Sequence, residues 1–183
     1  MQTMHWLLNI FGWSVNIDAI KTIKKSVIIE APHTSNWDFV LGMMAAISTG
    51  IKFRFIIKKE WNKPILGSVL KQLGAIFIDR SKSIGLTQQI IAQFKTMDEG
   101  HIIFTPEGTR SRVKKWKSGF YTIAHEAQLP ISVAYIDYAS KRIGIDHTLY
   151  PSGNMKEDGK KIKDFYQQIS PKHSQNFNPD WSI

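Results

Sequence analysis

Short apolar segments that alternate with helix-like stretches most strongly constrain how this chain folds. Six of these segments are predicted to be strands, at 27–31, 53–58, 75–80, 101–105, 129–137 and 142–150. Helical patterns lie between and after them, at 37–48, 64–74, 86–97, 120–128 and 156–169. Strands that alternate with helices are typical of α/β domains. We therefore expect an α/β fold with a mixed, mostly parallel sheet flanked by helices.

The chain is expected to form a single domain over residues 1–183, because its length fits one domain and no linker or repeat divides it. The segment 4–15 is apolar and contains Trp6, Phe11 and Trp13. It is shorter than the roughly 20 residues that span a bilayer. Two alternatives remain for this segment: a helix packed on the domain, or a membrane-contacting helix that lies at the lipid interface.

The net charge narrows the class of partner. Lys and Arg number 24 against 15 Asp and Glu, which gives a formal charge of +9. Such a balance favours polyanions, phosphorylated metabolites or anionic lipid surfaces. Nucleic acid is disfavoured, since aromatic and basic residues do not alternate on any predicted strand as stacking platforms require. The chain has no cysteine, which excludes disulfides and a thiolate nucleophile.

Polar clusters follow three of the predicted strands directly. They are HTSNWD at 33–38, DRS at 79–81 and PEGTRSR at 106–112. Ligands of α/β sheets bind just beyond the carboxyl ends of the strands, so these clusters are expected to converge on one site.

His33 is the strongest candidate for a catalytic base. Its imidazole titrates near neutral pH, and a carboxylate such as Asp38 can fix its tautomer and stabilise the imidazolium. No serine or cysteine nucleophile is placed beside this pair, so the hypothesis is that the substrate supplies a hydroxyl for His33 to deprotonate. The alternative is structural, because an aspartate in the first turn of a helix is favoured by the helix dipole whatever the function.

The third cluster is basic and suits a phosphate. Arg110 and Arg112, with Arg80 and Lys117 from flanking segments, offer guanidinium and ammonium donors. The alternative is a solvated basic loop. Glu107 is unusual in this setting, and we expect it to contact a substrate hydroxyl or to hold the arginines in place.

Together these motifs resemble those of the glycerolipid acyltransferases, in particular the 1-acylglycerol-3-phosphate acyltransferases. HTSNWD resembles the family's HX4D motif, in which four residues separate histidine and aspartate. GAIFIDRS at 74–81, FTPEGTRS at 104–111 and QLPISVAY at 128–135 are similar to its second, third and fourth motifs, in the same order. The resemblance covers residues 27 to 136, and four ordered motifs are far more specific than any one of them.

The resemblance implies a role for each matching residue. His33 would be the catalytic base and Asp38 its orienting partner. The glycerol phosphate would be held by substrate-binding residues of the second and third motifs and the stretch after them: Arg80, Glu107, Gly108, Thr109, Arg110, Ser111 and Lys117. It also implies no metal and no cofactor beyond the co-substrate, which is acyl-CoA or acyl-carrier protein.

The implied function is acyl transfer to a lysophospholipid in phospholipid biosynthesis, most simply from 1-acylglycerol-3-phosphate to phosphatidate. The fourth motif departs from the pattern at Ser132 and Ala134, where the family often has a second proline. Alternatives are another lysolipid acceptor, such as an amino-acid-containing one, a thioesterase, or a non-catalytic basic module that binds membranes. The expected location is cytoplasmic, with peripheral attachment to an anionic membrane surface.

Overall fold

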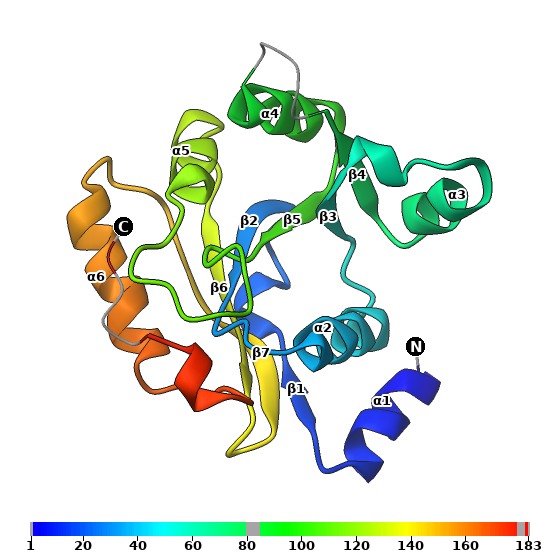
Figure 1. Ribbon diagram of the computed structural model, residues 1–183, viewed down its shortest axis with the longest axis vertical. Helices are drawn as coiled ribbons and strands as arrows, with labels where there is room; N and C mark the ends of the chain where they lie inside the picture. The colour runs from blue at the N-terminus through cyan, green and yellow to red at the C-terminus, as the bar shows by residue number, and fades with distance from the viewer. Residues whose placement is uncertain (1, 80–84, 179–181, 183) are drawn as a thin grey trace.

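The computed structural model describes residues 2–79, 85–178 and 182 (Figure 1). Its described strands form one sheet in the order β1-β7-β6-β2-β5-β3-β4. Each neighbouring pair of these strands is parallel except β6 and β7. The strands are β1 Ser14–Asn16, β2 Lys25–Glu30, β3 Phe53–Lys58, β4 Ala75–Ile78, β5 Gly100–Phe104, β6 Ile131–Asp137 and β7 Arg142–Leu149. The predicted α/β class and the mixed, mostly parallel sheet are thus confirmed.

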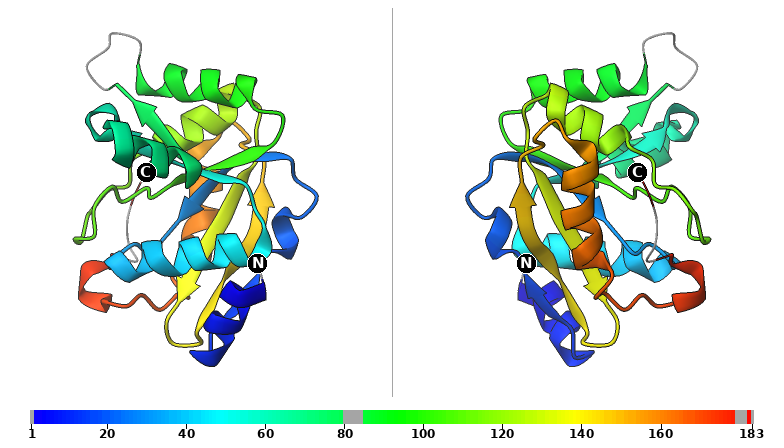
Figure 2. Two further views of the ribbon diagram at one scale, coloured as in Figure 1. Left: turned by 90° about the vertical axis from the view of Figure 1, so that its right-hand side faces the viewer. Right: turned by 90° about the vertical axis from the view of Figure 1, so that its left-hand side faces the viewer.

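Helices cover both faces of the sheet (Figure 2). They are α1 Gln2–Ile10, α2 Asn36–Thr49, α3 Pro64–Gln72, α4 Leu86–Thr96, α5 Gly119–Glu126 and α6 Met155–Tyr166. Three short 3-10 helices join them: η1 Asp18–Ile20, η2 Lys59–Trp61 and η3 Ser174–Asn176. Buried side chains of α4, α5 and α6 pack on one face, and α1 and α2 pack on the other. Helix α3 contacts β4 at the edge of the sheet.

The packing of the central strand β2 explains why its residues 27–29 are all apolar. Val27 and Ile29 join the large core beneath α4, α5 and α6, whereas Ile28 joins the smaller core on the opposite face. A parallel strand that is covered on both faces needs apolar side chains at successive positions. The polar Glu30 at its end is an exception, and it belongs to the site described below.

Most predicted elements lie within two or three residues of the observed ones. Strand β3 begins and ends where predicted, at Phe53 and Lys58. The sequence did not predict β1, which pairs with β7 over Ser14 to Asn16. Three residues are too few to show the alternating pattern by which a strand is recognised.

The N-terminal segment packs on the domain through one side only. Leu8 of α1 is buried against Leu41 and Ala45 of α2. Trp6, at 60% exposure, and Phe11, at 64%, remain on the surface. Helix α1 thus packs against α2, while contact with lipid stays a prediction. Among the described residues, no helix is long and apolar enough to cross a bilayer.

Candidate active site

The β2–α2 loop and the long loop after β5 are neighbours because their strands pair. Strands β2 and β5 are parallel, with Ile29 opposite Phe104, so the loops that follow them begin at the same end of the sheet. This brings HTSNWD and PEGTRSR together, as predicted. Arg80 and Ser81 of the second cluster lie outside the described residues, so the convergence of that cluster stays a prediction.

The start of α2 fixes the position of Asp38. Ser35 is the N-cap, and its hydroxyl accepts the Trp37 N–H at 3.2 Å. Asp38 Oδ2 accepts the backbone N–H groups of Thr34 and Ser35, both at 2.8 Å. Together these bonds form a capping box, in which an N-terminal side chain and the third helical side chain satisfy each other's backbone donors. Asp38 therefore has a structural role, because it caps α2. The same bonds hold its carboxylate close to His33.

A residue that the sequence did not suggest holds the other oxygen of this carboxylate. The hydroxyl of Tyr138 donates to Asp38 Oδ1 at 2.7 Å. Tyr138 follows β6 and packs edge-on against Trp13, with ring centroids 5.2 Å apart. A tyrosine so distant in sequence carries no local signal of this contact. Both oxygens of Asp38 are thus hydrogen-bonded.

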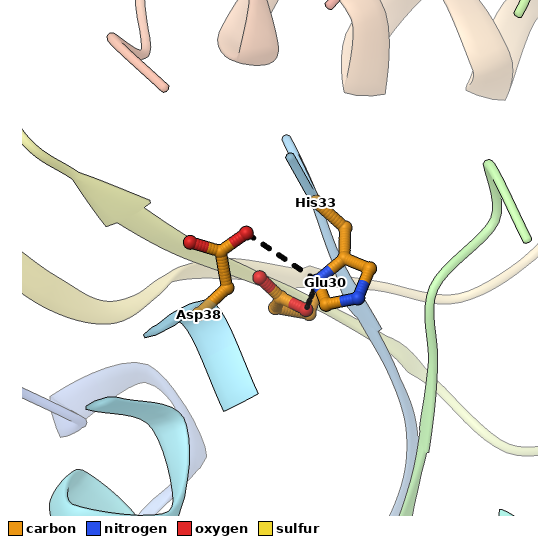
Figure 3. A group of neighbouring side chains, drawn as sticks. All are labelled: Glu30, His33 and Asp38. Carbon is orange, nitrogen blue, oxygen red and sulfur yellow. Dashed lines mark ion pairs between the residues drawn. The ribbon is translucent and has the colours of Figure 1, made fainter. Parts of the chain in front are cut away.

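His33 faces two carboxylates with one ring nitrogen (Figure 3). Its Nδ1 lies 3.4 Å from Glu30 Oε2 and 3.5 Å from Asp38 Oδ2. The other ring nitrogen, Nε2, points away from both carboxylates. Burial disfavours the imidazolium, but Glu30 and Asp38 outweigh it and raise the pKa of His33 above 6.5. The geometry suits a base that takes a proton at Nε2 while carboxylates balance the charge at Nδ1.

Glu30 is the second site residue that the sequence analysis missed. It ends β2, three residues before His33, and its side chain is 15% exposed. Burial raises the pKa of Glu30, and the neighbouring His33 acts in the opposite direction. A carboxylate directly after the buried apolar residues 27–29 was the signal that could have identified it, because such groups need a partner.

Glu107 supports His33 from the opposite loop. Its Oε2 accepts the His33 backbone N–H at 2.6 Å, and the residue is 5% exposed. Burial raises the pKa of Glu107 to about 8, so the carboxyl is mostly neutral at pH 7. This contact ties the third motif to the first. A contact between Glu107 and substrate stays a prediction.

The rest of the third motif lies at the surface beside His33. Gly108 has a φ of +69°, and a Cβ there would lie 2.6 Å from Lys117 Nζ. Thr109, Arg110 and Ser111 are exposed. The positive charge of Arg110 opposes protonation of His33. The loop thus presents cations and a glycine-shaped turn next to the base, while binding of substrate by these residues stays a prediction.

The C-terminal segment contacts both loops of the site. The His173 N–H donates to Thr34 Oγ1 at 3.3 Å, in the first motif. Arg112, just after the third motif, donates to the Phe177 carbonyl at 2.9 Å. These contacts cross more than 60 residues of sequence, and no motif indicated them.

The side chains around His33 are also a candidate metal site. Glu30, His33 and Asp38 each offer a ligand atom, all within 4.8 Å of one another, and they are the group with this property among the described residues. However, Asp38 Oδ2 already accepts two backbone N–H bonds that cap α2. A cation at this position would compete with those bonds. The expectation of no metal therefore stays a prediction.

Comparison with known proteins identifies the family. A family model described as Acyltransferase matches residues 14–137, which include the loops of His33, Asp38 and Glu107. The match ends one residue before Tyr138. No curated protein matched the chain.

Proposed function

Since this chain belongs to the acyltransferase family, we propose that it moves a fatty acyl group from a thioester to the free hydroxyl of a lysophospholipid. The donor is acyl-CoA or acyl-carrier protein. The acceptor that fits best is 1-acylglycerol-3-phosphate, and the product is then phosphatidate. The observation that carries the proposal is the geometry of His33. Its Nδ1 faces the carboxylates of Glu30 and Asp38, and its Nε2 points away from both.

The proposed reaction uses this arrangement. His33 Nε2 takes the proton of the acceptor hydroxyl as its oxygen attacks the thioester carbonyl. The new C–O bond forms, the C–S bond breaks, and the departing thiolate takes the proton from the imidazolium. Asp38 and Glu30 stabilise the imidazolium while it exists. Atoms and charges balance without a metal or prosthetic group.

A nucleophile supplied by the substrate agrees with the chemistry of the site. The chain has no cysteine. The nearest serine in the first motif, Ser35, uses its hydroxyl to cap α2. Direct attack by the acceptor therefore explains a base that has no protein hydroxyl assigned to it.

The phosphate is assigned to the basic loop. Arg110 is exposed beside His33, and Lys117 lies over the turn at Gly108. Guanidinium and ammonium groups bind phosphate through charge-assisted hydrogen bonds. Arg80 is proposed to complete this site, with Thr109 and Ser111 in support. A phosphate there would place the glycerol hydroxyl of a lysolipid close to the base.

An apolar cavity next to the base supports a fatty acyl substrate. It has a volume of about 80 Å³, lies between α2 and the sheet, and includes Glu30 and Gly42 in its wall. A Cβ added at Gly42 would meet no atom within 4 Å. The cavity thus offers an apolar surface that reaches Glu30, the neighbour of His33. An acyl chain would have to widen it to be held in full.

Exposed apolar side chains support a peripheral membrane site on the cytoplasmic face. They occur on three helices, α1, α2 and α3, and include Trp6, Ile10, Phe39, Ile47, Ile65 and Val69. Where such side chains form a contiguous patch, the patch marks a contact with lipid or protein. The net charge of +9 favours an anionic surface.

Thiol release tests the proposed function. Free thiol from a long-chain acyl-CoA is measured with and without lysophosphatidate, and the assay is repeated with acyl-carrier protein as donor. We expect thiol release that depends on the acceptor. Release without the acceptor would indicate a thioesterase. Release only with another lysolipid, such as an amino-acid-containing one, would change the acceptor and leave the chemistry.

A further inference from the structure

Two carboxylates, those of Asp38 and Glu30, are candidates for orienting His33. They differ in the hydrogen bonds that they already accept. Asp38 Oδ2 accepts two backbone N–H groups at 2.8 Å, and its Oδ1 accepts the Tyr138 hydroxyl. Its distance of 3.5 Å to Nδ1 exceeds the usual 2.7–3.2 Å of an N–H···O bond. To approach Nδ1 more closely, Asp38 would have to weaken the bonds that begin α2.

Glu30 has no such commitment. Within the described part of the chain, Glu30 Oε1 and His33 Nδ1 are the buried side-chain atoms without a hydrogen-bond partner. Glu30 Oε2 lies 3.4 Å from Nδ1, which is also longer than the usual bond, so the two carboxylates differ in their other partners and not in their distance to Nδ1. Unpaired buried polar atoms cost free energy, so one such atom on each of two neighbouring side chains points to an interaction completed during function.

The backbone of Glu30 is also firmly placed. It is the last residue of the central strand β2, where it lies opposite Ala134 of β6. Its side chain forms part of the wall of the apolar cavity under α2. A carboxylate in such surroundings is poorly solvated, and an adjacent imidazolium favours its charged form.

From these observations we infer that Glu30 is a positioning residue for His33, acting with Asp38. Glu30 accepts the Nδ1–H, holds the tautomer that leaves Nε2 free as the base, and pairs with the imidazolium when the acceptor's proton arrives. Asp38 then has a divided task, since it also caps α2. This inference rests on the proposed function for the catalytic step, but the pairing of Glu30 with His33 can be measured without substrate.

The test compares Glu30→Gln with wild type and with Glu60→Gln, a control that removes an exposed carboxylate in η2. Glutamine keeps the size of the side chain and removes its charge. We expect kcat for acyl transfer to fall about tenfold or more, with KM for lysophosphatidate within about twofold of wild type. In NMR titrations of the free protein, the His33 midpoint is expected to fall by about one pH unit or more. Glu60→Gln should change neither value.

A second variant, Glu30→Asp, retains the charge on a shorter side chain and should restore most of the His33 midpoint. A fall in kcat without a change in the midpoint would indicate a packing defect and would overturn the charge pairing. Unchanged kcat in Glu30→Gln would overturn the role in the reaction. If wild type does not acylate lysophosphatidate, the titration alone decides whether Glu30 pairs with His33.

Discussion

The buried carboxyl of Glu107 makes the stability of this protein depend on pH in a direction that can be worked out. Its pKa is raised from 4.5 to about 8, mainly by burial. Between these two values the unfolded chain has released the proton, whereas the folded protein still holds it. Because the folded state binds more protons, its stability falls as the pH rises through this window.

The size of the effect follows from the two pKa values. One pKa unit corresponds to about 1.36 kcal/mol. From about pH 5.5 to about pH 8.5, proton release from Glu107 costs the folded state about 3 kcal/mol. Glu107→Gln cannot ionise, yet its amide oxygen can still accept the His33 N–H. As the pH rises through this range, the free energy of unfolding of Glu107→Gln should therefore increase by about 3 kcal/mol relative to that of wild type.

Urea unfolding followed by tryptophan fluorescence, at closely spaced pH values, measures this difference. Comparing the variant with wild type cancels the other titrating groups, and Glu60→Gln serves as an exposed control. Since Glu107 is mostly neutral at pH 7, Glu107→Gln should also retain most of the turnover there. Parallel stability curves for wild type and Glu107→Gln would refute the assignment of a buried, neutral carboxyl.

Three further perturbations test other parts of the site. Tyr138→Phe keeps the ring but removes its hydrogen bond to Asp38, so it should lower the free energy of unfolding in urea by about 1.5–3 kcal/mol and also lower kcat. The same substitution at the exposed Tyr150 should change neither the unfolding free energy nor kcat. Arg110→Ala should raise the lysophosphatidate KM about 10- to 100-fold with a smaller effect on kcat, and unchanged KM would remove Arg110 from the phosphate site. Prolonged EDTA treatment should leave turnover unchanged, and loss that is restored by a divalent cation would contradict the metal-free reaction.

Local signals explain how much of the fold the sequence predicted. Strand β3 was located to the residue because its aromatic and aliphatic residues lie between the charged Lys52 and Lys59. The start of α2 was predicted to within one residue, at 37 against the observed Asn36, from Ser35 or Asn36 as the N-cap, and the structure has Ser35 in that position. The short β1 gave no periodic pattern, so the edge strand beside β7 could not be foreseen. Patterns within one segment can be read from sequence, whereas pairing between distant segments depends on packing.

The same distinction applies to the site. His33 and Asp38 were found because they lie in one short motif. Tyr138 contacts Asp38 across 100 residues of chain, and Glu107 reaches His33 across 74. Glu30 was overlooked because it lay inside the predicted strand 27–31, and no role was assigned to its side chain there. The role of Glu30 depends on where its side chain points, and the sequence alone does not show this.

Formation of phosphatidate tests the central claim most directly. Wild type, His33→Ala and the control His125→Ala, which alters an exposed histidine of α5, are incubated with a long-chain acyl donor and lysophosphatidate. Phosphatidate is then quantified by mass spectrometry. The account predicts equal product from wild type and His125→Ala, and a loss of about 10²- to 10⁴-fold in His33→Ala. Product formed at the wild-type rate by folded His33→Ala would contradict it.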